Sequence, residues 1–138
     1  MSYLLDTNVI SELVCARPNR SVVDWIDALP SEALFLSVLT LGEIRKGVEK
    51  LTAGPRRDKL VVWLEHDLPG WFSQRILPID TTVAENWGKL TAQAGRSVPA
   101  IDSLLAATAL THGLILVTRN VGDFVFANVT VFDPWGDT

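Results

Sequence analysis

The chain has 138 residues, 48% of them hydrophobic and 20% charged, which fits one domain spanning residues 1–138 and excludes a disordered polypeptide. Its net charge of −4 excludes binding of nucleic acid through a general excess of Lys and Arg. No apolar run reaches the roughly 18 residues of a membrane span, and no secretory signal opens the chain, so we expect a cytoplasmic protein that does not contact membranes.

The N-terminal half of the chain alternates short apolar runs with helical patterns. We expect a strand at residues 3–5, helices at 8–16 and 22–29, a strand at 33–37, and helices at 40–51 and 56–68. Leu41 and Ile44 recur at helical spacing in the third of these helices. Pro30 is expected to end the second helix and Pro69–Gly70 the fourth, because proline cannot continue the helical hydrogen bonds.

The C-terminal half continues the same alternation. We expect a strand at residues 76–79, helices at 83–95 and 101–112, and strands at 114–118 and 129–132. Gly113 suits the position after a helix end, and the run from Leu114 is continuously apolar, as in parallel strands that are covered on both faces. Strands alternating with helices predict an α/β fold with a mostly parallel central sheet.

Four carboxylates stand near the ends of the predicted strands. Asp6 follows the first strand, Glu43 lies early in the helix after the second, Asp102 heads the helix at 101–112, and Asp123 follows the strand at 114–118. Ligands of open α/β sheets bind outside the carboxyl ends of the strands. The spacing therefore predicts that these four side chains converge on one edge of the sheet.

Convergence of four acids has a chemical consequence. Two carboxylates about 5 Å apart repel by about 3 kcal/mol at an effective dielectric constant of 20, so four would raise each other's pKa values or require a cation. Ligands that are all oxygen favour Mg²⁺ or Mn²⁺. Each acid also has a structural interpretation: Asp6 as a helix cap, Asp102 as a first-turn acid, Asp123 as a turn cap and Glu43 as the partner of a lysine on its own helix.

Cysteine and histidine are scarce in this chain, whereas the basic residues are clustered. Cys15 is the only cysteine, which excludes an internal disulfide, and the isolated His66 and His112 exclude histidine-pair zinc motifs. Half of the twelve Lys and Arg residues fall within fifteen positions: Arg45, Lys46, Lys50, Arg56, Arg57 and Lys59. This cluster is either a solvated helix surface or a basic rim beside the acids that can hold a polyanion.

Four blocks of the sequence, LLDTNVISEL, SVLTLGEIRKGV, PAIDSLLAATAL and HGLILVTRNVGDF, together resemble the PIN-domain nucleases, in particular VapC-like and FitB-like toxins. The resemblance covers essentially the whole chain and implies a PIN-like three-layer α/β/α fold. It also implies that Asp6, Glu43, Asp102 and Asp123 form an acidic quartet that holds Mg²⁺ or Mn²⁺ and cleaves single-stranded RNA with a metal-activated water. Asp6 and Asp102 are the expected direct ligands, and Glu43 and Asp123 are expected to act partly through water.

The resemblance extends to residues and partners around the acids. Thr7, Asn8, Thr118 and Asn120 match polar positions that orient the quartet, and Arg119 is either a phosphate contact or a structural ion pair. Proteins of this kind form homodimers and are silenced by a small antitoxin, with which they can build a higher assembly. The resemblance therefore implies an RNA substrate, single-stranded or structured, and a cognate antitoxin as partner.

One alternative function remains open from the sequence. A non-catalytic PIN-fold module that binds RNA or protein would carry the same fold without hydrolysis. That alternative predicts that removal of the cation, or Asp6→Asn, leaves the protein's activity in the cell unchanged. Phosphatases of the haloacid dehalogenase type are disfavoured, because Asn8 stands where they need a second aspartate.

Overall fold

A five-stranded sheet forms the centre of the protein in the computed structural model, which describes residues 1–136. The order across the sheet is β3 (Ile76–Leu77), β2 (Leu34–Ser37), β1 (Tyr3–Leu5), β4 (Ile115–Val117) and β5 (Val131–Phe132). All neighbouring strands are parallel, and Leu4 pairs with Phe35 on one side and Leu116 on the other. The carboxyl ends of β1 and β4, where Asp6 and Thr118 follow, therefore lie at the same edge of the sheet.

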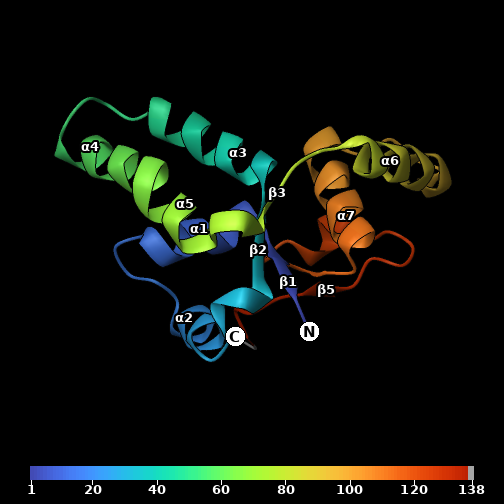
Figure 1. The fold of residues 1–138 in the computed structure, drawn as a ribbon, viewed down its shortest axis with the longest axis horizontal. Helices are drawn as coiled ribbons and strands as arrows, with labels where there is room; N and C mark the ends of the chain where they lie inside the picture. Colours follow the sequence, from blue (N-terminus) through green and yellow to red (C-terminus); the bar gives the residue numbers. More distant parts are fainter. Residues whose placement is uncertain (137–138) are drawn as a thin grey trace.

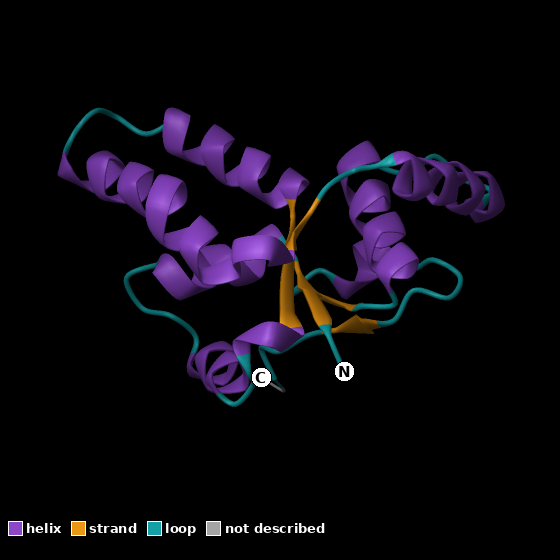
Figure 2. Ribbon diagram, viewed as in Figure 1, coloured by secondary structure: helices purple, strands orange, loops and turns teal. Residues whose placement is uncertain are grey.

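Helices cover both faces of this sheet. One face carries α1 (Thr7–Val14), α2 (Arg20–Asp27), α3 (Val38–Glu49), α4 (Pro55–Val62) and α5 (Leu68–Phe72), and the other carries α6 (Thr81–Ala94) and α7 (Ala100–His112) (Figure 1). Figure 2 shows the strands between the two groups of helices, which confirms the predicted three-layer α/β/α fold with a parallel sheet. Within residues 1–136, no helix combines the length and apolarity that a membrane crossing needs.

The core consists of two apolar clusters, one on each side of the sheet. Leu5 lies in the cluster beneath α1–α5 together with the fully buried Phe72, whereas its neighbour Leu4 lies with Leu105 and Phe124 in the cluster beneath α7. Successive residues of a strand point to opposite faces, so this division follows from the strand geometry. The continuous apolar runs of the sequence are thus buried on both sides, as expected for a parallel sheet.

The predicted end of the fourth helix is wrong. Pro69–Gly70 does not close the fourth helix, because the chain passes from α4 through a π-helical turn at Trp63–Asp67 directly into α5. In that turn the N–H of Leu68 bonds to the carbonyl of Trp63, five residues back. The wider turn accommodates Pro69, which has no N–H to donate and whose ring would collide with a carbonyl of a regular helix. The helix instead ends at Phe72, before Ser73 with a φ of 49°.

The edge strands are shorter than the sequence predicts. β3 stops at Leu77, where Pro78 removes the next donor, and β5 contains only Val131 and Phe132. Each of these strands pairs on one side only. The first helix likewise ends at Val14, two residues before the predicted boundary.

Candidate active site

Asp6 occupies the turn between β1 and α1 and is held there by two hydrogen bonds. Its backbone is extended, and Oδ1 accepts the Thr7 N–H at 2.7 Å, so the helix-cap interpretation is correct. Oδ2 accepts the hydroxyl of Thr118 at 2.8 Å, across from the end of the neighbouring strand β4. One carboxylate therefore caps a helix and is fixed in orientation by a residue 112 positions later in the chain.

Thr118 is the centre of a polar network at this edge. The buried hydroxyl donates to Asp6 and accepts hydrogen bonds from the Asn8 side-chain amide at 3.2 Å and from the Asn120 N–H at 3.1 Å. Oδ1 of the Asn8 side chain in turn accepts the backbone N–H of Arg119 at 3.4 Å. The polar residues that the sequence singles out after β1 and β4 are thus in direct contact with one another.

The other three predicted carboxylates lie at different depths, and two of them share a hollow with Asp6. Glu43 is exposed on α3 and accepts the Thr7 hydroxyl at 2.6 Å, while Asp102 is half-buried in the first turn of α7. These two acids and Asp6 line a common surface hollow of about 520 Å³, which we call the acidic hollow. Asp123 is exposed in the short 3₁₀ turn Val121–Phe124 and does not line the acidic hollow, although its charge reaches Asp102.

The pKa values tie the four acids into one electrostatic group. Burial raises the pKa of Asp6 above its ordinary value of 3.8; the hydrogen bonds from Thr118 and Thr7 oppose this, and the charges of Glu43 and Asp102 add to it. Burial also raises the pKa of Asp102, and the charges of Asp123 and Glu43 raise it further. Positive charge brought to the group would therefore favour the ionised forms of Asp6 and Asp102.

The donor set fits a hard divalent cation, because all four acids offer oxygen. Among residues 1–136, however, no three such side chains stand close enough together to clamp an ion as they are oriented here. Oxygens of Asp6 and Glu43 are instead engaged by the hydroxyls of Thr118 and Thr7. Asp6 and Asp102, both raised in pKa, are the acids that a cation would stabilise most directly in their ionised form.

The acidic hollow also contains residues that sequence reasoning missed. Glu12 lies in the second turn of α1 and accepts the N–H of Asn19 at 2.8 Å, and that hydrogen bond is the main cause of its lowered pKa. Helical spacing from Asn8 could have indicated Glu12. Trp135, which follows β5, also lines the hollow; its position depends on the pairing of β4 with β5, which no local pattern reveals.

Two further hollows flank α3 and meet the acidic hollow at Glu43. The first, about 690 Å³, lies between α1, α3 and α4 and has apolar walls that include Ile44, Val48, Leu60 and Trp63. The second, about 520 Å³, borders the outer side of α3. We call them the apolar hollow and the outer hollow.

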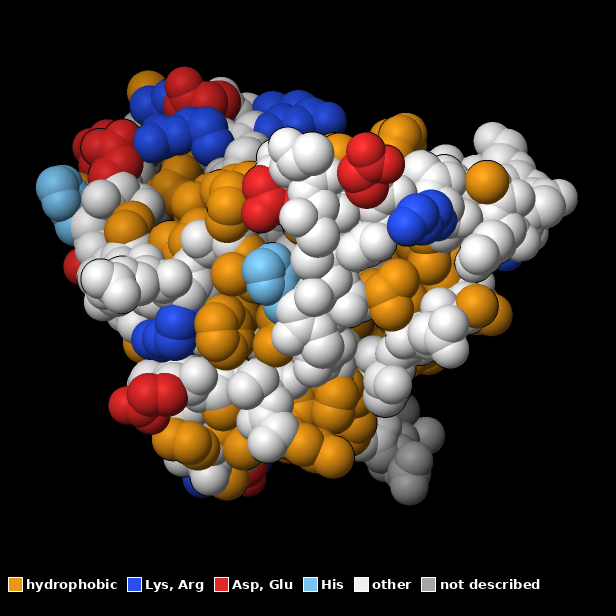
Figure 3. Space-filling view, turned by 45° about the vertical axis from the view of Figure 1, so that its right-hand side comes forward, with side chains coloured by type: hydrophobic (Ala, Val, Ile, Leu, Met, Phe, Trp, Pro, Cys, Tyr) orange, Lys and Arg blue, Asp and Glu red, His pale blue; other side chains and the backbone are white. Residues whose placement is uncertain are grey.

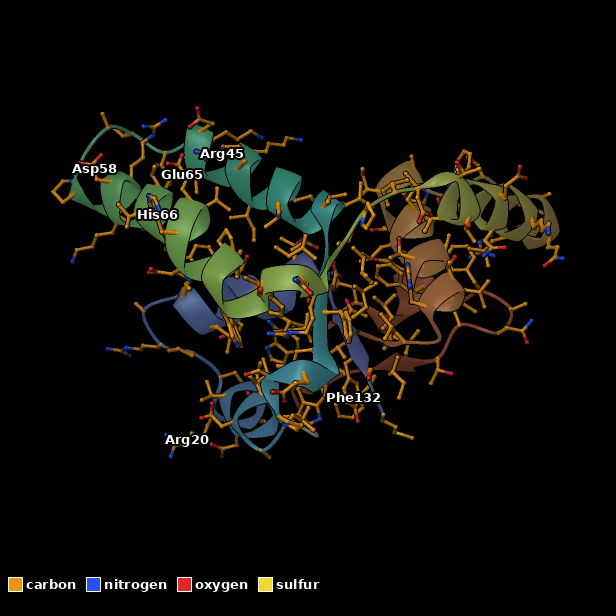
Figure 4. The ribbon with its side chains drawn as sticks, viewed as in Figure 1. Arg20, Arg45, Asp58, Glu65, His66 and Phe132 are labelled. Atoms are coloured by element: carbon orange, nitrogen blue, oxygen red, sulfur yellow. The ribbon has the colours of Figure 1, made fainter. Side chains whose placement is uncertain are left out.

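The basic cluster is divided between ion pairs and these hollows. Arg45 pairs with Glu65 at 2.7 Å (Figure 4), and Arg57 pairs with Glu49 at 2.6 Å, so the structural interpretation holds for these two arginines. The other four line the hollows: Lys46 and Lys50 the outer one, Arg56 and Lys59 the apolar one. Figure 3 shows Lys and Arg side chains gathered at one corner of the molecule, with acidic side chains among them.

Comparison with known proteins shows the family to which the chain belongs. The PIN domain profile matches residues 3–129. Toxin FitB of Neisseria gonorrhoeae is 42% identical over 97% of this chain and 99% of its own length, and VapC ribonuclease Y4jK of Sinorhizobium fredii is 39% identical over 96% of each. The crystal structure of FitAcB from Neisseria gonorrhoeae superposes with a TM-score of 0.90 at 40% identity, covering 98% of this chain and 99% of that one. The chain belongs to the PIN-domain family.

Proposed function

We propose that the protein is an endoribonuclease that uses Mg²⁺ or Mn²⁺ to hydrolyse RNA, single-stranded or structured, and acts as the toxin of a toxin–antitoxin pair. The observation that carries this proposal is the meeting of Asp6, Glu43 and Asp102 in one hollow at the carboxyl edge of a parallel sheet, where the charge of Asp123 also reaches Asp102. The names of the relatives, a toxin and a ribonuclease, support the same function.

In this proposal the acids differ in their roles. Asp6 and Asp102 would hold the cation directly, and the exposed Glu43 and Asp123 would act partly through water. A bound divalent cation supplies an activated water and stabilises the charge that develops on the phosphate. Thr118 and Thr7 fix the directions of the Asp6 and Glu43 carboxylates, while Asn8 and Asn120 fix Thr118.

The substrate phosphate has a candidate contact in Arg119. This residue is exposed, lines the acidic hollow and has no carboxylate partner within 4.0 Å in the described part of the chain. A guanidinium offers planar donors that match phosphate oxygens. We therefore assign Arg119 to phosphate binding rather than to a structural ion pair.

The basic rim gives the RNA a path toward the acids. Lys46 and Lys50 line the outer hollow together with Glu43, so a backbone lying along α3 would meet two positive charges before the acidic hollow. A protein with a net charge of −4 needs such local positive charge to hold a polyanion.

The apolar hollow is the proposed seat of an antitoxin segment. Its walls are mostly apolar, yet Thr7, Cys15 and Glu43 belong both to it and to the acidic hollow. An amphipathic segment packed there would block access to the acids.

We further propose that the protein forms a homodimer, which joins a higher assembly when the antitoxin binds. The exposed apolar side chains of Val38 and Ile101 at the outer hollow support this proposal.

Cleavage of a labelled single-stranded RNA pool tests the proposal. Purified protein is assayed with Mg²⁺ or Mn²⁺ and with EDTA, beside an Asp6→Asn variant purified in parallel. Metal-dependent cutting that leaves 5′-phosphate and 3′-hydroxyl ends and is absent in the variant is the expected result. Absence of cutting under every condition, together with activity in the cell that survives Asp6→Asn, would favour the non-catalytic alternative.

A further inference from the structure

Arg119 and Trp135 form an aromatic–cation contact at the acidic hollow. The guanidinium carbon of Arg119 lies 5.3 Å from the centroid of the Trp135 ring, and both residues line the hollow with Asp6. A cation over the face of a Trp ring is attracted by the electrons of that face, and the attraction is stronger for Trp than for the other aromatic residues. The exposed Arg119 side chain is thereby held on a buried platform, since Trp135 is only 6% exposed.

The platform itself is rigidly placed. The backbone N–H of Trp135 donates to Asp133 Oδ1 at 2.8 Å, and the preceding carbonyl, that of Pro134, accepts the Ser21 hydroxyl at 2.9 Å. Gly136 has a φ of +79°, and a Cβ there would lie 3.0 Å from Ser21 Oγ, so this close approach to α2 needs glycine. The indole packs in the apolar cluster beneath α1–α5.

Glu12 adds an electrostatic element to the same contact. Its pKa is held below the ordinary value mainly by the hydrogen bond from the Asn19 N–H, with smaller effects from Cys15, the Trp135 indole and the charge of Arg119. The buried indole N–H has no hydrogen-bond partner in the described part of the chain. Glu12 lines the same hollow as Arg119 and Trp135 and presents a negative charge to Arg119.

The backbone of Arg119 is fixed from the other direction. Its N–H donates to Asn8, which contacts Thr118, which in turn orients Asp6. Both ends of the Arg119 side chain are thus defined, one by the network of Asp6 and the other by the Trp135 ring. An unsupported guanidinium beside four acids would be drawn onto their carboxylates, where it would compete with a cation.

We propose that Trp135, assisted by Glu12, is a positioning residue that keeps the Arg119 guanidinium off the acidic quartet and ready to bind a phosphate of the RNA substrate. This inference rests on the proposed nuclease function and deepens it. Holding the side chain in its binding geometry beforehand removes part of the entropy cost of ordering it on the substrate. Trp135 thereby acts through Arg119 and does not touch the RNA.

A double-mutant cycle with Trp135→Leu and Arg119→Gln tests the coupling. Two readouts are used: KM for an RNA oligonucleotide with Mg²⁺, and the Kd of the same oligonucleotide for each variant in an Asp6→Asn background with EDTA. Loss of a charge-assisted hydrogen bond predicts a rise of roughly tenfold in both values for Arg119→Gln. Trp135→Leu should raise them less, and the double variant should match Arg119→Gln alone, because Trp135 has nothing left to position.

Matched variants separate positioning from packing. Trp25→Leu removes an equally large ring that packs on the same cluster but does not line the acidic hollow, so it should leave KM and Kd unchanged. Trp135→Phe retains a ring face and should restore most of the binding that Trp135→Leu removes. Additive effects of Trp135→Leu and Arg119→Gln, or an equal effect of Trp25→Leu, would overturn the proposal. Glu12→Gln, a substitution outside the core, repeats the cycle should Trp135→Leu fail to fold.

A readout independent of cleavage distinguishes this inference from the proposed function. In proton NMR spectra, the side-chain methylenes of Arg119 should be shifted upfield by the Trp135 ring, and the shift should persist in part in Trp135→Phe and vanish in Trp135→Leu. Absence of the upfield shift in the unsubstituted protein contradicts the positioning role even where RNA is cleaved. An upfield shift in a protein that cleaves no RNA would confirm the contact between Arg119 and Trp135, whereas the missing cleavage would contradict the nuclease function.

Discussion

The Thr118 hydroxyl, at the end of β4, donates a hydrogen bond to Asp6 Oδ2 at 2.8 Å, beyond the end of the neighbouring strand β1. The pairing of Leu5 with Val117 brings the two residues together, so the sheet register itself orients the acid. The same hydroxyl accepts two further hydrogen bonds, which uses its full capacity.

Removal of this hydroxyl should damage the site more than the fold. Thr118→Val keeps the shape but deletes the hydrogen bond that lowers the pKa of Asp6, so that pKa should rise further. Without this orienting hydrogen bond, metal affinity or cleavage should drop roughly 10- to 100-fold, with a stability cost of about 1 kcal/mol. Thr108→Val is the control, because Thr108 is equally buried in α7 but bonds only to the Leu104 carbonyl; it should cost stability without weakening metal binding.

The acids should make the metal-free protein less stable as pH rises. The folded-state pKa values of Asp6 and Asp102 lie above 3.8, so the folded state retains protons that the unfolded state releases, and stability falls as pH increases from about that value. Asp6→Asn and Asp102→Asn should abolish part of this fall and leave stability at pH 7 unchanged or higher. Urea unfolding of each variant with EDTA, at pH 4.5 and pH 7, measures the difference. Unfolding of both variants at neutral pH would show that the carboxylates are needed for the fold.

The basic rim predicts a salt-sensitive effect on KM. Replacement of Lys46 and Lys50 by Gln should raise KM for RNA and leave kcat unchanged. It should also reduce the slope of log K against log salt by about 1 for each phosphate that a lysine no longer neutralises. Lys89→Gln on α6 is the control, because that exposed lysine does not line a hollow beside the acids. An unchanged salt slope in the Lys46 and Lys50 double variant would place the RNA elsewhere.

Substitutions of Gly47 should change the stability of the protein and the access of substrate independently. This glycine lies inside α3 and borders both the apolar and the outer hollow. A Cβ at this position would meet no atom within 4 Å apart from the adjoining residues and backbone of its own helix. Gly47→Ala should therefore stabilise the protein by about 0.5–1 kcal/mol. Gly47→Met should remain stable but raise KM, since its longer side chain would enter the hollows that meet at Glu43. Gly88→Met, at an equally open position on α6, should leave KM unchanged.

The sequence predicts the carboxyl ends of β1, β2 and β4 to within one residue, because an apolar run followed by polar residues marks a local change. Asp6 and Thr118 both stand at such a change, and their contact then follows from strand pairing. The continuation of the helix past Pro69 was not predictable in the same way, since it depends on one hydrogen bond from Leu68 to Trp63 that propensity does not describe. Helix patterns identify the kind of element more securely than its end.

Contacts between distant segments are the part that the sequence does not reveal. Arg45 and Glu65 meet because α3 lies beside the following helices, and Trp135 reaches Arg119 because β5 pairs with β4. In both cases the partner is chosen by tertiary packing, so the charged residues of the sequence do not themselves show which arginine is already paired and which is available to a ligand. Local patterns therefore indicate the acids, whereas the residues around them depend on the assembled fold.

Calorimetric titration of Mn²⁺ tests the central claim, that the four acids form one cation site. The unsubstituted protein should bind Mn²⁺, Asp6→Asn and Asp102→Asn should lose that binding, and Glu85→Gln, an exposed acid on α6, should keep it. Loss confined to the two aspartate variants is the result that the acidic quartet predicts. Equal Mn²⁺ binding by all four proteins would contradict it and would place the cation outside the quartet.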